Sequence, residues 1–130
     1  MSNNFFPLSA EELVRRINKI PKVELAMLPT ALEFLPNISK ELEINLYIKR
    51  DDCTALAFGG NKTRHLEFIM AKVVTGNYDC VLAGGSSQSN WCRQTAAAAN
   101  KLNIESFLVL MHGVKGNQMQ GNFLLYNILG

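Results

Sequence analysis

The sequence has 130 residues, of which 48% are hydrophobic and 18% charged, and its formal net charge is +2. This length and composition are typical of one globular domain or of a piece of a larger one. The small charge argues against nucleic acid and anionic membranes as partners. No stretch approaches the roughly 20 apolar residues that span a bilayer, and the N-terminus lacks the apolar core of a signal peptide. We therefore expect neither a nucleic acid nor a membrane partner.

The cysteines and histidines are few and are not clustered. Cys53, Cys80 and Cys92 fall in no metal-binding spacing, and the chain has only two histidines. Cysteines in such numbers and positions are typical of reduced, partly buried thiols in a cytoplasmic protein. We expect no metal site.

The first third of the chain predicts two helices and a strand. Ser9 and Glu12 have the spacing of a capping box, and the apolar residues that follow share one helical face before Pro21. Pro29 and Pro36 then interrupt the chain, and a short helix is expected after them, near residues 37–43. Alternation of apolar and polar side chains predicts a strand over residues 46–49.

The remainder predicts alternating helices and strands. A helix is expected over 61–75, where apolar residues recur at helical spacing, and strands are expected over 80–83 and 105–111. Between these strands lies a helix over 90–102, whose four consecutive alanines form a small face for close packing. A last helix begins at residue 121. This order indicates an α/β fold with a partial parallel sheet and flanking helices.

Three strands are few for such a sheet, because a parallel sheet needs both faces covered. The chain also stops at Gly130, directly after an apolar helical stretch. We therefore expect an incomplete domain.

Two loops carry most of the residues that could do chemistry. The first is Gly59-Gly60-Asn61-Lys62 and the second runs from Gly84 to Asn90. Both are expected to follow strands and to enter helices, where open α/β sheets bind ligands. Neither matches a nucleotide-binding motif, so phosphate or nucleotide binding would rest on architecture alone. The serines of the second loop could also simply cap the helix.

Lys62 stands where a helix is expected to begin, although the helix dipole there disfavours a cation. It could be an ordinary solvated lysine. Alternatively, the helix terminus, with Arg64 nearby, would favour the neutral amine, which a lysine needs to attack an aldehyde. For other polar and thiol residues, packing or turn roles are favoured: Asp51 and Asp52 as hydrogen-bonding turn residues and Cys92 as a packed thiol. Trp91 could stack on a ligand or pack in the core.

The combination of "YIKRDD…GGNKTRHLEF", "AGGSSQSNWCRQTAAAANKL" and "GNFLLYNILG" strongly resembles the 1-aminocyclopropane-1-carboxylate deaminase and D-cysteine desulfhydrase family. The resemblance runs from about Leu28 to the last residue. It implies a pyridoxal 5′-phosphate enzyme of the tryptophan-synthase-β-like fold (fold type II). It also implies a lyase or deaminase of amino-acid metabolism, with hydrolytic release of ammonia, and a homodimer.

The resemblance also implies roles for individual residues. Lys62 matches the family's Schiff-base lysine, with Asn61 beside it in the cofactor pocket. Asn90 would hydrogen-bond the 3′-oxygen of the cofactor, and Ser89 would lie near the lysine and the substrate as a catalytic residue. The turn from Gln88 to Trp91, which includes Ser89 and Asn90, would hold the substrate carboxylate. The family usually has His or Gln where this chain has Trp91, so the resemblance leaves the substrate open.

By resemblance, D-cysteine would give pyruvate, sulfide and ammonia, and the cyclopropane substrate would give 2-oxobutyrate and ammonia. Family members are more than twice as long, and their phosphate-binding loop lies in the part without a counterpart here. We therefore expect an N-terminal fragment that is inactive alone. Residues 1–45 would belong to the cofactor-binding domain, and 46–130 would carry the lysine loop and the start of the small domain. The alternatives are a non-enzymatic Rossmann-like phosphate- or nucleotide-binding module and a catalytically silent paralogue.

Overall fold

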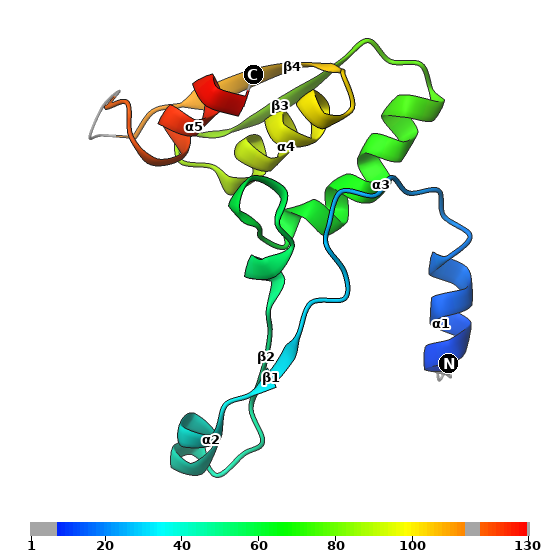
Figure 1. The fold of residues 1–130 in the computed structure, drawn as a ribbon, viewed down its shortest axis with the longest axis vertical. Helices are drawn as coiled ribbons and strands as arrows, with labels where there is room; N and C mark the ends of the chain where they lie inside the picture. The colour runs from blue at the N-terminus through cyan, green and yellow to red at the C-terminus, as the bar shows by residue number, and fades with distance from the viewer. Residues whose placement is uncertain (1–7, 114–117, 130) are drawn as a thin grey trace, which may run out of the picture.

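The computed structural model describes residues 8–113 and 118–129, and it has the mixed α/β architecture that the sequence predicts. A body contains a parallel sheet with helices packed around it, and a narrow arm projects away from this body (Figure 1). In the sheet, β3 (Cys80–Ser86) pairs with β4 (Glu105–Met111), and α4 (Asn90–Lys101) connects the two strands.

The two strands of the sheet run in register from Cys80 opposite Glu105 to Ser86 opposite Met111. Successive side chains point to opposite faces of a strand. Alternate residues of both strands are therefore exposed: Leu82 and its partner Phe107 lie on this open face and are 72% and 50% exposed. The other face packs against α4.

Helix α4 is the centre of the body, in contact with both strands and with α3 (Lys62–Thr75) and α5 (Gly121–Leu129). Its alanine run, Ala96–Ala99, is entirely buried. Small side chains let neighbouring backbones approach closely, as the sequence predicts for this run. The core cluster combines α3, α4 and the segment before the arm: Leu25, Leu66, Met70, Ala98 and Ala99.

Helix α3 begins at Lys62, with Asn61 as its N-cap residue, and ends at Thr75, with Gly76 as its C-cap residue. Glu67, in the middle of the helix, is buried, and its carboxylate accepts hydrogen bonds from the N–H groups of Leu25 (3.1 Å) and Ala26 (3.0 Å). These bonds hold the segment before the arm against the helix. The body therefore includes residues that precede the arm as well as those that follow it.

The arm consists of β1 (Leu32–Phe34), α2 (Pro36–Leu42) and β2 (Tyr47–Lys49). The short helix and the strand lie where the sequence predicts them. The expectation that this strand joins the parallel sheet is wrong: β2 pairs antiparallel with β1 in a separate two-stranded sheet. Strand β1 was not predicted, because its three residues lie between Pro29 and Pro36 and are too few to show an alternation.

The ends of two further elements differ from the expected ones. Helix α1 (Ala10–Ile17) is capped by Ser9, which accepts the N–H of Glu12, but it ends before Pro21. The Glu12 side chain does not complete the capping box, because it pairs with Arg15 and Arg16. Strand β3 extends three residues beyond the expected end and includes both glycines of the second loop.

The three cysteines are free, and only Cys92 is buried; the expectation of partial burial is wrong for Cys53 and Cys80, which are exposed. Cys80 lies on the open face of β3, and Cys53 lies in the turn at the base of the arm. In the described residues, no helix is long and apolar enough to cross a membrane. Within the same ranges, no three His, Cys, Asp or Glu residues form a group suited to a metal ion.

Candidate active site around Lys62

The chain between the arm and α3 is a tight loop containing two 3₁₀ turns, η1 (Asp51–Cys53) and η2 (Leu56–Phe58). It ends in Gly59 and Gly60, whose φ angles are +72° and +130°. A Cβ at Gly59 would lie 1.8 Å from the backbone oxygen of Asp52, and one at Gly60 would lie 2.5 Å from Nε2 of Gln94. Glycine is therefore required at both positions by conformation and by space.

Thr54 fixes this loop from within. Its side chain is fully buried, and its hydroxyl donates to the carbonyl of Gly60 and accepts from the N–H of Gly60, both at 2.9 Å. The same N–H lies 2.8 Å from the carbonyl oxygen of Asp51. A buried polar group of this kind is stable only when its hydrogen bonds are made, so the loop has one well-defined conformation.

Two consecutive side chains of α4 hold the loop against that helix. Gln94 donates from Nε2 to the carbonyl oxygen of Gly59 at 2.8 Å, and Arg93 donates from Nη2 to the same oxygen at 3.0 Å. Thr63, directly after Lys62, donates to Oε1 of Gln94 at 2.7 Å. The start of α3 and the loop before it are thus attached to the second turn of α4.

The second loop lies at the start of α4. Ser89 is the N-cap residue, and its hydroxyl accepts the N–H of Cys92 at 3.2 Å. The capping role considered for this serine is confirmed. Its carbonyl accepts the hydroxyl of Tyr126 from α5 at 3.0 Å. Burial raises the pKa of Tyr126, so this phenol stays a donor at neutral pH.

Asn90 is oriented by two donors. Its Oδ1 accepts hydrogen bonds from Nη1 of Arg93 at 3.0 Å and from Nδ2 of Asn122 at 2.9 Å. Arg93 also donates to Oδ1 of Asn122 at 2.8 Å. Because the oxygen of the Asn90 amide is occupied, its NH₂ group is the end available to an acceptor. The amide can therefore serve as a hydrogen-bond donor to a bound molecule.

Lys62 is partly exposed, at the first position of α3. None of the ion pairs among the described residues includes its amine. Arg64, whose positive charge was expected to favour a neutral amine nearby, pairs with the carboxylate of Asp51 at 2.7 Å. The same hydrogen bond is the main cause that lowers the pKa of Asp51. Lys62 thus presents an unpaired primary amine on a loop whose backbone is fixed.

The structure brings the two predicted loops together through Arg93, which contacts both Gly59 and Asn90. Gln88 is already engaged with the start of α5, since its Oε1 accepts the N–H of Asn122 at 2.9 Å. Of the two roles left open for Trp91, the structure shows packing, against the core cluster. Asn61 is exposed beside Lys62.

Sequence reasoning missed the residues that join the loops. These residues belong to no motif with a known spacing. The one available signal was the pair Arg93-Gln94, which follows the Ser89-Asn90 turn by one helical turn. These residues are Thr54, Thr63, Arg93, Gln94 and Asn122.

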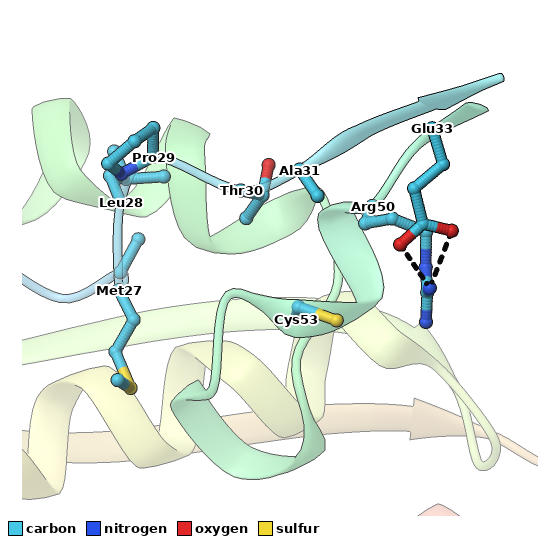
Figure 2. A pocket seen from close by; sticks show the side chains of 9 residues that line it. Met27, Leu28, Pro29, Thr30, Ala31, Glu33, Arg50 and Cys53 are labelled. Atoms are coloured by element: carbon cyan, nitrogen blue, oxygen red, sulfur yellow. Dashed lines mark hydrogen bonds and ion pairs between the residues drawn. The ribbon is translucent and has the colours of Figure 1, made fainter. Parts of the chain in front are cut away.

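A separate hollow of about 490 Å³ lies at the base of the arm (Figure 2). Leu28 and Pro29 line it, together with Arg50 and Cys53. Figure 2 shows the carboxylate of Glu33 directed at the guanidinium of Arg50, from which Nη1 donates at 2.9 Å. The hollow therefore offers a paired cation, and none of the predicted site residues lines it.

The alternative of a phosphate- or nucleotide-binding module depends on a free glycine loop after β3. Gly84 and Gly85 belong to the strand itself and pair with Val109 and Leu110 of β4. A Cβ at Gly85 would lie 2.8 Å from Oγ of Ser89. This glycine thus permits the helix start to pack on the strand. The glycine loop that this alternative requires does not form at this position.

Comparison with known proteins identifies the family of the chain. The family model described as "Pyridoxal-phosphate dependent enzyme" matches residues 23–130. The chain belongs to this family of pyridoxal-phosphate-dependent enzymes.

Individual relatives within this family are similar to the chain over most of its length. A putative 1-aminocyclopropane-1-carboxylate deaminase of Pyrococcus horikoshii is 42% identical over 113 residues, which are 86% of this chain and 34% of the relative. D-cysteine desulfhydrase of Klebsiella pneumoniae is 40% identical over 119 residues, covering 88% and 36%. A crystal structure of an ACC deaminase homologue superposes with a TM-score of 0.82 at 40% identity, covering 91% and 35%. The chain thus shares that fold and spans about a third of the length of these relatives.

Proposed function

We propose that this chain carries the lysine-bearing part of a pyridoxal-phosphate-dependent lyase or deaminase that acts on a small amino acid. The observation that carries the proposal is Lys62, a partly exposed residue at the start of α3 whose amine enters none of the ion pairs of the described residues. Its loop is attached through Arg93 to the turn that holds Asn90. Membership of the family and the names of the relatives support the same function.

The residues present suit this cofactor. The aldehyde of the cofactor needs a primary amine to form an imine with the protein, and Lys62 supplies such an amine at a fixed position. The NH₂ group of Asn90 is free to donate to an oxygen of the cofactor ring, because Arg93 and Asn122 occupy its own oxygen. When bound, the pyridine ring supplies an electron sink for bond breaking next to the substrate amine.

The remaining assignments are proposals of the same kind. We propose that Asn61 lies beside the cofactor, and that the N-terminus of α4 binds a substrate carboxylate through Gln88, Ser89, Asn90 and Trp91. Free N–H groups at a helix start favour an anion, which supports the carboxylate position. Ser89 would approach the reacting atoms as a catalytic residue. Cytoplasmic location, a homodimer, and the division into 1–45 and 46–130 are also proposals; β1 and β2 pair across that division.

Two substrates are proposed from the names of the relatives. D-cysteine would yield pyruvate, sulfide and ammonia, and 1-aminocyclopropane-1-carboxylate would yield 2-oxobutyrate and ammonia. The relatives named for these two reactions have nearly the same identity to this chain, 40% and 42%. Both compounds are small amino acids with a carboxylate, which suits the start of α4.

The test is a spectral titration with pyridoxal 5′-phosphate, comparing the wild-type protein with Lys62→Ala. We expect a visible absorption band from the condensed cofactor that is lost in Lys62→Ala. Lys72→Ala is the matched control, because Lys72 is an exposed lysine in the last turn of the same helix. A band that persists without Lys62 contradicts the proposal. Turnover of either substrate is not expected of these 130 residues alone, because they span about a third of the length of the relatives.

A further inference from the structure

We infer that Gln94 is a positioning residue for Lys62, which it holds by bonding the chain on both sides of that lysine. The inference rests on the proposed function, since it assigns a device that serves the reactive amine. Among the described residues, the hydrogen bonds of the Gln94 side chain go to Gly59 and Thr63 and not to the amine of Lys62. Gln94 acts through Gly59 and Thr63, which lie three residues before Lys62 and one residue after it.

The two ends of the Gln94 amide have different partners. Nε2 donates to the carbonyl oxygen of Gly59 at 2.8 Å, and Oε1 accepts the hydroxyl of Thr63 at 2.7 Å. Both distances are those of good hydrogen bonds. One planar group therefore fixes the spacing between the end of the glycine loop and the first turn of α3. Lys62 lies between these two attachment points.

The environment of Gln94 makes this attachment hard to replace. Gln94 and Thr63 are both 0% exposed, so water cannot substitute for either bond. The backbone of the loop lies close to the amide, because a Cβ added at Gly60 would lie only 2.5 Å from Nε2. Thr54, also fully buried, extends the network on the other side of Gly60. The polar network is thus buried, and it bonds residues that precede and follow Lys62 in the chain.

This arrangement separates two requirements on the lysine. Its amine must be free, and none of the ion pairs among the described residues holds it. Its backbone must be fixed, because a misplacement of about 1 Å at a reacting group can reduce a rate by a factor of about 100. A side chain that bonded the amine directly would hold the lysine in place, but the amine would no longer be free. Gln94 fixes the backbone and leaves the amine free.

The test compares Gln94→Met with Thr95→Val. Methionine keeps the length of the side chain but has no amide to donate or accept. Thr95 is the matched control: it is the next residue of α4, it is buried, and its hydroxyl has no hydrogen-bond partner within the described ranges. The first measurement is the rate at which pyridoxal 5′-phosphate and borohydride label Lys62, with Lys72 as an internal reference. The second is hydrogen exchange of the amides of residues 60–64 without cofactor.

We expect Gln94→Met to slow the labelling of Lys62 about tenfold or more, with Lys72 unchanged, and to increase exchange over 60–64. Thr95→Val should match the wild type in both measurements. A folded Gln94→Met protein with wild-type labelling and exchange overturns the inference. If Gln94→Met does not fold, Thr63→Val decides, since it removes only one of the two bonds and is expected to show the same changes in smaller degree. Wild-type behaviour of that variant also overturns the inference.

The two readouts distinguish the inference from the function on which it rests. If Lys62 of the wild-type protein is not labelled, the proposed function fails. The exchange measurement still shows whether Gln94 holds the loop, because it needs no cofactor. If Lys62 is labelled and neither readout responds to Gln94→Met, the function stands and the positioning role is wrong.

Discussion

The body and the arm are held together by different interactions. In the body, α4 buries seven of its twelve residues, including a glutamine and a threonine. In the arm, every residue of β1 and β2 is exposed, and Ser39 is the buried residue of α2. Backbone pairing, the ion pair of Arg50 with Glu33 and the contact of Phe34 with Tyr47 stabilise the arm. The arm is thus a surface structure, whereas the body has an interior.

The candidate site belongs to the body, although the chain reaches it directly from the arm. Gly59, Gly60 and Thr63 are bonded to buried groups of the loop and of α4, not to strands of the arm. Changes inside the body should therefore alter both stability and the environment of Lys62. Changes of the same chemical kind on the arm should alter neither.

The largest expected effect is the loss of a leucine from the core. Leu66, on α3, is 0% exposed, whereas Leu42, on α2, is 53% exposed. Leu66→Ala should lower the free energy of unfolding by about 2–5 kcal/mol, because it removes buried apolar contacts and leaves a cavity. Leu42→Ala, the same substitution in a helix of the arm, should change it by less than about 0.5 kcal/mol. Urea denaturation measures both, and equal losses would contradict the distinction between body and arm.

A smaller effect is expected from adding one methyl group at the strand that meets α4. A Cβ at Gly85 would lie 2.8 Å from Oγ of Ser89 and 3.0 Å from Sγ of Cys92, whereas one at Gly84 would meet only a carbonyl oxygen at 3.9 Å. Gly85→Ala should cost about 1–3 kcal/mol through overpacking. It should also slow the labelling of Lys62, because it displaces the start of α4.

The control for that substitution is its neighbour. Gly84→Ala adds the same methyl group on the open face of β3, where there is space for it. Its unfolding free energy and its labelling rate should therefore stay close to those of the wild type. If Gly84→Ala were the more harmful of the two, the account of how α4 packs on β3 would be wrong.

The smallest expected effect concerns the junction of arm and body. The hydrogen bond from Arg64 holds the pKa of Asp51 below its usual range. An aspartate in the unfolded chain has a pKa of about 3.9, and the pKa of Asp51 in the folded state is lower. The ionised carboxylate therefore stabilises the fold above the unfolded-state pKa. This contribution is lost as the pH falls through the folded-state pKa. Asp51→Asn should lower stability at neutral pH and weaken the loss on acidification. Unfolding midpoints between neutral pH and pH 3 measure this change.

The control for the pH experiment is Asp79→Asn. Asp79 is exposed at the start of the sheet and takes part in none of the ion pairs of the described residues. Its replacement should leave the stability at neutral pH close to that of the wild type, since no ion pair of the described residues is lost. An acid response of Asp51→Asn identical to that of the wild type would show that the pair with Arg64 does not stabilise the fold.

Much of the fold could be predicted from local patterns. The start of α3 at Lys62 follows from two glycines and a helical apolar period, and the run Ala96–Ala99 indicated close packing correctly. Family and cofactor class followed from the combined motifs, which the family model confirms. The extent of β3 was underestimated, because glycine is rare inside strands unless another backbone or side chain packs closely on it. Here the start of α4 packs on Gly85.

The joining of the two loops could not be predicted, because it depends on contacts between residues distant in sequence. Gln94 bonds Gly59 and Thr63, 35 and 31 residues away, and Arg93 bonds Asn122, 29 residues away. No periodicity or local motif records such pairs. The same limit explains why the strand of residues 46–49 was assigned to the wrong sheet: its partner β1 carried no readable pattern.

The most direct test of the central claim is to find which lysine the cofactor selects. The wild-type protein is mixed with pyridoxal 5′-phosphate, reduced with borohydride and digested, and the label is located by mass spectrometry among the eight lysines of the sequence. We predict that Lys62 carries most of the label at low cofactor concentration, because its amine enters no ion pair within the described part of the chain and its backbone is fixed. A label spread evenly over exposed lysines such as Lys72 would contradict the account.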